Sequence, residues 1–420
     1  ESQWTRIGRS AVGILALGLV AVAVWLSIFS HSDIPSVKDE SEATSSDSTE
    51  AVISTGPLDE EIAQSWPRFR GPGGRGISAF ANIPTGWDGT SGKNIRWKMP
   101  VPLPGNNSPI VWKDRVFLTG ADENHREVYC FDSSSGKLLW QKEVPGTPQS
   151  TARVPKVNDD TGYAAPTAAT DGHRVFAIFA NGDLAAFDFQ GKPAWSKSLG
   201  IPDNAYGHAS SLTTYKNLLL VQFDQKGSKS AWKSKLFAFD SASGKIVWQT
   251  DRDVPDSWTS PIVISNAGRE QIITAASPWV IAYDPRSGQE IWRAKCLQND
   301  IGPSPTFAAG KVFAVNESPA LSAIRVDGVG DVTATHIVWK GEEGLPDICS
   351  PLANHEFVFL LASYGLLTCY DAENGNILWV EEFSGDFSSS PSIAGKLVYV
   401  ISRTGKGWVQ TAARAVHSNC

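Results

Sequence analysis

A short motif that recurs along the chain constrains its fold more than any other feature. Its first complete copy, at residues 129–140, reads Tyr-Cys-Phe-Asp-Ser-Ser-Ser-Gly-Lys-Leu-Leu-Trp. Asp132 suits a turn because its carboxylate accepts backbone N–H bonds, and Gly136 supplies the positive φ that closes the turn. Trp140 then falls on the returning strand. The motif therefore predicts two strands joined by a tight turn.

The motif tryptophan recurs at a steady interval. The copies, including an N-terminal half copy and one that lacks the Asp, place it at Trp97, Trp140, Trp195, Trp248, Trp292, Trp339 and Trp379. The first and last of these are 282 positions apart (379 − 97), so six steps give a mean period of 47. A fixed period of roughly 20–50 residues indicates a repeat architecture, in which each unit buries its apolar face against its neighbours.

Each copy also has an opening pair of small residues, usually ending in proline, and then further strands. In the second copy, Ala165-Pro166 precedes a strand at 174–180, an Asn181-Gly182 hairpin turn and a strand at 183–188. Four strands per copy predict an all-β fold, a β-propeller of four-stranded blades. Seven openers are visible, and the irregular tail leaves the ring at seven blades or a truncated eight. We expect the strand of Trp97 to complete the last blade.

The N-terminus carries a membrane signal. Residues 11–29 are 19 apolar or small residues without a charge, about the length that spans a bilayer. Arginines precede this run and acids follow it, so residues 1–10 are expected in the cytoplasm and the rest outside it. We predict a transmembrane signal-anchor helix in the inner (cytoplasmic) membrane, single-pass, with the propeller on the periplasmic side. A cleaved signal peptide is the alternative.

The charge distribution separates the segments that follow. Residues 30–61 hold nine acids and one lysine, and residues 30–62 are predicted to be a disordered acidic Ser/Thr-rich linker. Residues 63–85 form a Gly/Pro-rich strap; its GxGxxG match lacks the strand and helix of a dinucleotide site. The propeller is assigned to residues 86–420. Outside the linker the charges nearly cancel, so nucleic acid is not an expected partner.

The spacing (Ala/Cys)-(Phe/Tyr)-Asp-x-x-x-Gly-x-x-x-Trp resembles the tryptophan-docking repeat of pyrroloquinoline-quinone (PQQ)-like β-propellers, over residues 86–410. The resemblance implies that the seven tryptophans fasten each blade to the next. One branch of these proteins is the PQQ-dependent alcohol dehydrogenases, and another is non-enzymatic and BamB-like. The strap behind an N-terminal anchor is most similar to the membrane-anchored, planctomycete-type group.

No motif for catalysis, a cofactor or a metal emerges from the residues. The five cysteines form no adjacent or CxxC pair, no DxDxDG loop or HxxxH pair occurs, and GxSxG is absent. We therefore assign no catalytic, cofactor-binding or metal residue. PQQ with Ca²⁺ would be needed only under the alternative reading, a quinoprotein oxidoreductase. A carbohydrate-binding or sensory propeller is the third reading.

The residues just ahead of the openers offer a candidate binding surface. Because one register of successive blades must form a ring, they are expected at the mouth of the propeller as a rim: Tyr163, His208, Asp256, Trp258, Asp300, Asp347 and Asp386. Such aromatic and acidic residues would favour a basic segment of a protein partner or another cell-envelope component. The competing explanation is that each Asp caps its own turn. The resulting hypothesis is a membrane-anchored extracytoplasmic propeller that acts as a non-catalytic binding or scaffold protein.

Overall fold

The computed structural model describes residue 57, residues 59–227 and residues 233–415. The predicted cytoplasmic N-terminus, the predicted anchor at 11–29 and most of the predicted linker lie outside the described residues. The last residues assigned to the linker belong to helix α1 (Asp59–Ala63). Within the described ranges, no helix is both long and apolar enough to cross a membrane.

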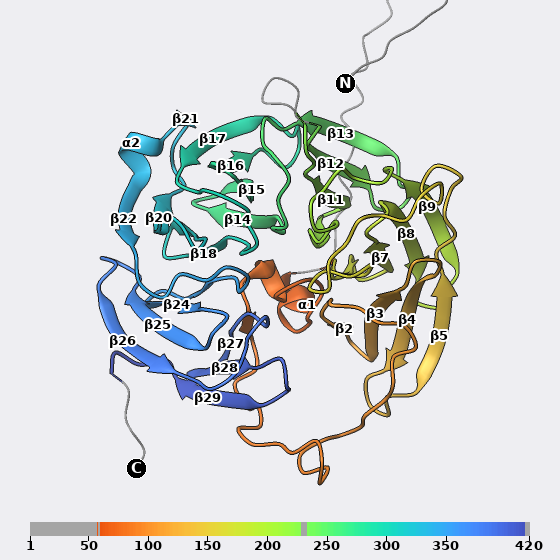
Figure 1. Cartoon of the computed structure of the whole chain (residues 1–420), viewed down its shortest axis with the longest axis horizontal. Helices are drawn as coiled ribbons and strands as arrows, with labels where there is room; N and C mark the ends of the chain where they lie inside the picture. Colours follow the sequence, from red (N-terminus) through yellow and green to blue (C-terminus); the bar gives the residue numbers. More distant parts are fainter. Residues whose placement is uncertain (1–56, 58, 228–232, 416–420) are drawn as a thin grey trace, which may run out of the picture. The chain divides into compact units, whose positions relative to one another are not determined.

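Seven β-sheets surround a common centre (Figure 1). The first three blades contain β2 (Ile110–Trp112), β3 (Arg115–Ala121), β4 (Arg126–Asp132) and β5 (Leu138–Glu143); β6 (Ala169–Thr170), β7 (Arg174–Ile178), β8 (Asp183–Asp188) and β9 (Pro193–Ser198); and β10 (Thr213–Tyr215), β11 (Leu218–Phe223), β12 (Lys235–Asp240) and β13 (Ile246–Asp251). The fourth contains β14 (Ile262–Asn266), β15 (Arg269–Ala276), β16 (Trp279–Tyr283) and β17 (Glu290–Lys295).

The remaining three blades continue in chain order. They contain β18 (Thr306–Ala308), β19 (Lys311–Ala314), β20 (Leu321–Arg325) and β22 (Ile337–Gly341); β23 (Leu352–Ala353), β24 (Phe357–Leu361), β25 (Leu366–Asp371) and β26 (Ile377–Glu382); and β27 (Ser392–Ala394), β28 (Leu397–Ile401) and β29 (Gly407–Thr411) with β1 (Ile77–Ser78). Figure 1 shows the first strand of a blade nearest the centre and the fourth at the periphery. The predicted all-β propeller of four-stranded blades is confirmed.

Burial explains the sequence patterns of the strands. The third strand of the second blade, β8, is buried on both faces except at its last residue, since blades pack against it from either side. It therefore reads as a nearly continuous apolar run. The outer strand β5 alternates between half-buried and exposed residues, as expected of a strand with one face in solvent.

Six of the seven motif tryptophans join their blade to the next one. Trp97, Trp140, Trp195, Trp248, Trp339 and Trp379 donate their indole N–H to a backbone carbonyl in the turn of the following copy, at 2.8–3.3 Å. Five of these rings also cover the motif glycine of that turn; the exception is Trp379, whose acceptor Ala413 lies in a copy without that glycine. A Cβ placed on Gly244, whose φ is +67°, would lie 2.5 Å from Trp195. The glycine thus meets two requirements, the positive φ and the absence of a side chain under the indole.

Trp292 differs from the others because the copy that follows it lacks the Asp–Gly turn. In its place the chain forms β21 (Gly330–Asp331) and α2 (Thr333–His336). Strand β21 pairs in parallel with β17 as a fifth strand of the fourth blade. Trp292 is fully buried and donates its indole N–H to Gln271 Oε1 of its own blade, at 2.7 Å. The degraded repeat therefore changes how these two blades are joined.

A second ring of contacts runs through the openers near the centre. In six consecutive steps a backbone N–H donates to the hydroxyl of the next blade, at 2.8–3.0 Å, along Ser108, Thr167, Ser211, Ser260, Ser304, Ser350 and Ser390. In the second blade the member is Thr167, which follows the predicted opener Ala165-Pro166. This ring satisfies backbone groups that the first strands leave unpaired.

The strap fills the centre of the ring. Trp66 exchanges two backbone hydrogen bonds with Val111 in the first blade. Arg68 donates to Thr214 O at 2.8 Å, and Arg70 donates to Pro351 O at 2.8 Å, so the two side chains reach the third and sixth blades. Burial lowers the pKa of both arginines to about 10, which leaves them charged at neutral pH. The segment therefore occupies the place of a central channel.

The last blade is closed differently from the sequence prediction. Trp97 does not lie on a strand; the added strand is β1, which pairs in parallel with β27 at the inner side of the blade. Asp88 and Gly92 still form the motif turn, with Asp88 N donating to Lys93 O at 3.0 Å. Trp97 still covers Gly136 of the first blade.

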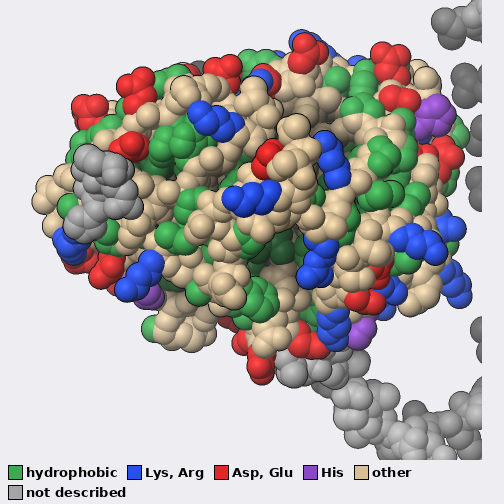
Figure 2. Space-filling view, turned by 90° about the horizontal axis from the view of Figure 1, so that it is seen from below, with side chains coloured by type: hydrophobic (Ala, Val, Ile, Leu, Met, Phe, Trp, Pro, Cys, Tyr) green, Lys and Arg blue, Asp and Glu red, His purple; other side chains and the backbone are tan. Residues whose placement is uncertain are grey.

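Figure 2, a view from below Figure 1, shows Lys and Arg side chains around a hollow that contains hydrophobic side chains.

Candidate functional site

The antiparallel blades divide their loops between two faces. The blade-to-blade connections lie on one face together with the turns between second and third strands; we call this the connection face. The opposite face, the turn face, holds the turns between first and second strands and the motif turns. Lys113, in the turn between β2 and β3, pairs with Glu61 at 3.0 Å, so the described chain enters at the turn face.

The predicted rim residues all belong to the connections, but their environments differ. His208 is 1% exposed, packs against Phe223 with ring centroids 5.1 Å apart, and is unavailable at the surface. Burial lowers its pKa to about 4. Asp347 is half-buried and Asp386 exposed, and neither carboxylate pairs with another described residue. Tyr163 donates its hydroxyl to Glu123 Oε1 at 3.3 Å.

Three predicted residues come together around one that the prediction missed. Tyr206 is 40% exposed, its ring lies 4.9 Å from that of Trp258, and its hydroxyl donates to Asp300 Oδ2 at 3.0 Å. Trp258 donates its indole N–H to Gly207 O at 3.0 Å, which holds its ring in place. Asp256 caps the same loop, accepting from Ala205 N at 2.9 Å. We call Tyr206, Trp258, Asp300 and Asp256 the Tyr206 cluster.

The two carboxylates of the Tyr206 cluster, Asp256 and Asp300, lie in different environments. Burial raises the pKa of Asp256, and the nearby charge of Asp300 adds to that effect. The hydrogen bond to Asp300 raises the pKa of the Tyr206 phenol. Asp256 therefore serves its loop, in line with the turn-capping explanation, whereas Asp300 and the exposed ring of Tyr206 face solvent. Tyr206 could have been suspected from its place, since it is a large aromatic residue in a polar connection directly before a glycine.

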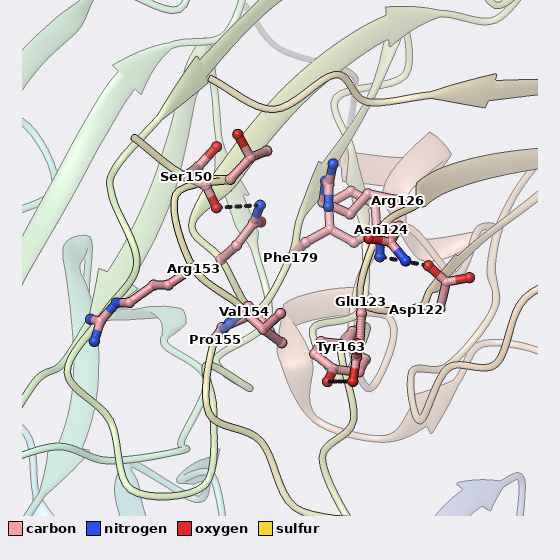
Figure 3. Close-up of a pocket in the computed structure, with 13 residues that line it drawn as sticks. Asp122, Glu123, Asn124, Arg126, Ser150, Arg153, Val154, Pro155, Tyr163 and Phe179 are labelled. Carbon is pink, nitrogen blue, oxygen red and sulfur yellow. Dashed lines mark hydrogen bonds between the residues drawn. The ribbon is translucent and has the colours of Figure 1, made fainter. Parts of the chain in front are cut away.

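On the connection face, the space between two neighbouring blades forms a pocket in some places and is filled by side chains in another. A pocket of about 120 Å³ lies between the first two blades, lined by residues from 122–126, 150–155 and 179–181 and by Tyr163 (Figure 3). A pocket of about 460 Å³ lies at the equivalent position between the fourth and fifth blades, with Lys295 and Lys340 among its residues. Both are formed by the same kinds of loop.

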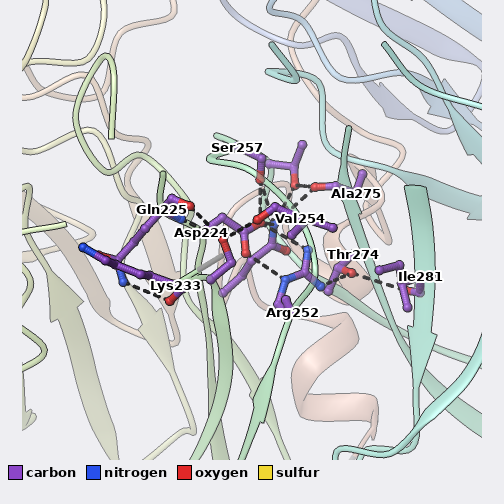
Figure 4. Close-up of polar contacts among 12 residues, drawn as sticks. Asp224, Gln225, Lys233, Arg252, Val254, Ser257, Thr274, Ala275 and Ile281 are labelled. Carbon is purple, nitrogen blue, oxygen red and sulfur yellow. Dashed lines mark hydrogen bonds and ion pairs between the residues drawn. The ribbon is translucent and has the colours of Figure 1, made fainter. Parts of the chain in front are cut away.

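Between the third and fourth blades the same position is filled by a buried polar network (Figure 4). Arg252 and Asp224 are both fully buried. The Arg252 Nε and Nη2 atoms donate to the two Asp224 oxygens at 2.7 and 3.2 Å, and Nη1 donates to Thr274 and Tyr283 at 2.6 and 3.0 Å. Four of the five guanidinium donors of this buried arginine thus have an acceptor.

The described residues do not fit a quinone with its calcium ion. The centre of the ring is occupied by the strap, and no group of three or more His, Cys, Asp or Glu in the described ranges could hold a metal ion. The four described cysteines are buried, and burial raises the pKa of each thiol to about 12. Such thiols stay protonated and are poor nucleophiles at neutral pH.

The seven sheets, the tryptophan contacts between blades and the repeat spacing define a PQQ-like β-propeller repeat protein. The model of the family described as "Outer membrane protein assembly factor BamB" matches residues 84–212, 232–343 and 327–415. The chain belongs to this family.

Individual relatives are distant. The chain is 22% identical over 250 residues to the outer membrane protein assembly factor BamB of Moranella endobia (strain PCIT), covering 54% of this chain and 59% of the relative. It thus spans less than two thirds of that relative's length. The crystal structure of BamB from Moraxella catarrhalis matches with a TM-score of 0.55 and 13% identity, over 76% of this chain and 88% of that one. Quinohemoprotein alcohol dehydrogenase from Comamonas testosteroni gives a TM-score of 0.45 and 13% identity, over 85% and 79%. At these identities, likeness to solved structures bears on the fold alone.

Proposed function

We propose that the protein is a membrane-tethered, extracytoplasmic scaffold that binds a protein partner on its connection face and performs no catalysis. The observation that carries the proposal is the Tyr206 cluster, in which an exposed tyrosine is held rigidly by Trp258 and Asp300. A large aromatic ring that is already fixed can be buried at low entropic cost, which is typical of the residues that dominate interface energies.

Two further observations support this proposal. The relative from Moranella endobia is named an outer membrane protein assembly factor, which suggests a partner in the cell envelope. The described chain also enters at the turn face, where Glu61 meets Lys113. A tether that ends there leaves the opposite, connection face accessible. We further propose that residues 11–29 form the membrane anchor and that the propeller is exported.

A pull-down with the tagged full chain tests the binding face. Cell-envelope proteins bound to the wild type, a Tyr206→Ser variant and a Tyr364→Ser control are compared per folded molecule. Tyr364 is 61% exposed in the turn between β24 and β25 on the same face, so the control removes a tyrosine that is even more accessible than Tyr206. The proposal expects Tyr206→Ser to lower partner recovery tenfold or more, equivalent to about 1.4 kcal/mol, and Tyr364→Ser to leave it unchanged. Equal recovery from all three proteins would rule out this face.

Topology is tested separately. Protease added to the outside of spheroplasts is expected to digest the propeller and leave a short membrane-bound fragment containing residues 11–29. A propeller protected until the membrane is permeabilised would contradict the proposed export.

A further inference from the structure

Arg126, at the start of β4, is a buried cation whose hydrogen-bonding capacity is unused. The residue is 7% exposed, yet a guanidinium carries five N–H donors. Its Nε is buried without a hydrogen-bond partner and lies 3.5 Å from Asp183 Oδ2, and no guanidinium nitrogen of Arg126 donates a hydrogen bond to another described residue. Leaving such donors without an acceptor costs free energy, more so for a charged group.

Asp183 balances the charge of Arg126 but does not accept a hydrogen bond from its guanidinium. The same Asp183 oxygen is already engaged by Asn181 Nδ2 at 2.6 Å, and Asp183 is 2% exposed. Arg252 provides the contrast within this chain, because Asp224 accepts from it with both oxygens and Thr274 and Tyr283 accept from its Nη1. At the equivalent position between the first two blades, the place of the missing acceptors is the 120 Å³ pocket that Arg126 lines.

The other pocket residues indicate the chemistry of an occupant. Asp122 is engaged by His125, and Glu123 accepts the Tyr163 hydroxyl, so both acidic groups of the lining have partners. Arg153 also lines the pocket as an exposed second cation, with its guanidinium extended outward, away from Arg126 (Figure 3). The ring of Tyr163 and the neighbouring Val154, Pro155 and Phe179 supply apolar wall. The pocket thus offers free donors beside a short apolar surface, in a volume suited to a side chain and well below the ~300 Å³ of a drug-sized site.

We propose that this pocket binds the carboxylate of an aspartate or glutamate side chain of the partner protein, with Arg126 as its principal ligand. The planar guanidinium matches a carboxylate through two parallel N–H···O bonds, and Arg153 adds attraction from the rim. The inference rests on the proposed function, because the pocket opens on the same connection face as the Tyr206 cluster. A partner segment would place an acidic side chain here and an apolar or aromatic one on Tyr206.

The test measures the binding of three small probes to the full chain by ligand-observed NMR. The probes are N-acetyl-glutamate N-methylamide, its glutamine equivalent, which has the same shape without the charge, and its lysine equivalent. The variants are Arg126→Lys, which keeps a cation beside Asp183 but removes the planar fork, and Arg153→Gln at an exposed position. Arg174→Lys in β7 is the matched control, since Arg174 pairs with Asp171 at 2.9 Å outside the pocket. Circular dichroism confirms that each variant is folded.

The glutamate probe is expected to bind at least tenfold more tightly than the glutamine probe. Arg126→Lys should abolish that preference, Arg153→Gln should weaken it a few-fold, and Arg174→Lys should retain it. Should Arg126→Lys fail to fold, the Arg153→Gln effect and the probe preference still decide. Equal binding of the glutamate and glutamine probes, absence of binding, or preference for the lysine probe would overturn the inference.

The outcome is separable from that of the proposed function. If the glutamate probe does not bind while Tyr206→Ser still loses the partner, the acidic-side-chain pocket is wrong and the binding face stands. If the probe binds through Arg126 while Tyr206→Ser retains the partner, the pocket stands and the proposed binding face is wrong.

Discussion

The indole N–H of Trp195 donates to the backbone carbonyl of Ser241 at 2.9 Å, which joins the outer strand of the second blade to a motif turn of the third. The same turn presents Gly244 beneath the indole ring. One residue pair therefore combines a hydrogen bond and a close packing contact, and six of the seven motif tryptophans form the hydrogen bond. The stability of the ring should depend on such contacts in a way that point variants can measure.

Gly244→Ala is expected to destabilise the protein more than Gly268→Ala. Both glycines have a positive φ, +67° and +81°, so both variants pay the cost of the left-handed conformation. Only the Gly244 Cβ would meet an indole, at 2.5 Å, whereas nothing lies within 4 Å of a Cβ at Gly268. The overpacking should add about 1–3 kcal/mol to the loss in unfolding free energy, measured by urea denaturation. Equal losses would mean that the indole contact is not tight in solution.

Ser304→Ala tests the inner ring of hydroxyls. The Ser304 hydroxyl accepts from the backbone N–H of Ser260 at 2.8 Å, and Ser260 is 5% exposed. Removing the acceptor leaves a buried donor unsatisfied, at a cost of about 1–3 kcal/mol. Ser265→Ala, at an exposed position in β14, should change the unfolding free energy by less than about 0.5 kcal/mol. A loss as small for Ser304→Ala would show that water replaces the hydroxyl.

Asp224→Asn should be strongly destabilising because it leaves the Arg252 charge buried without its counter-ion. Breaking a buried ion pair from one side typically costs about 3–5 kcal/mol. The pair of Lys235 with Asp251 is the control, since the Asp251 side chain is 82% exposed and Asp251→Asn should cost less than about 1 kcal/mol. Thermal unfolding of both variants makes the comparison, and similar melting temperatures would contradict a dry, charged network.

His208 should make the protein less stable in mild acid. Its pKa is lowered by burial to about 4 from an ordinary value of 6.5. Between these values the unfolded chain binds the proton and the folded chain does not, so stability falls as the pH falls from 6.5 toward 4, by up to about 1.4 kcal/mol per pH unit. Below about 4 both states are protonated and this loss levels off.

The His208 effect is measured as a difference. Unfolding free energies of the wild type and His208→Phe are compared at pH 7 and pH 4.5, with the exposed His173→Phe as control. His208→Phe should lose less stability on acidification than the wild type, and His173→Phe should behave like the wild type. Identical pH dependence of all three proteins would mean that His208 takes up its proton in the folded state.

Much of the fold was predictable because its determinants are local and repeated. The Asp–Gly turn, the returning tryptophan and the alternating strands recur every 47 residues on average, and each copy after the N-terminal half copy forms one sheet. The candidate site was less predictable. The rim residues were chosen by register alone, and register places a residue in a connection without deciding whether its side chain turns inward, as His208 does, or outward, as Asp300 does.

The sequence by itself determined the repeating blades, because the turn and strand signals lie within a few residues of one another and each blade needs its neighbours to bury its apolar faces. Only the tertiary structure decided the rest. Arg68 and Arg70 reach carbonyls 146 and 281 positions away, β1 pairs with the last blade, and Tyr206 meets Asp300 across 94 positions. These contacts arise when ring closure brings distant segments together, and no local pattern records which side chains will then meet.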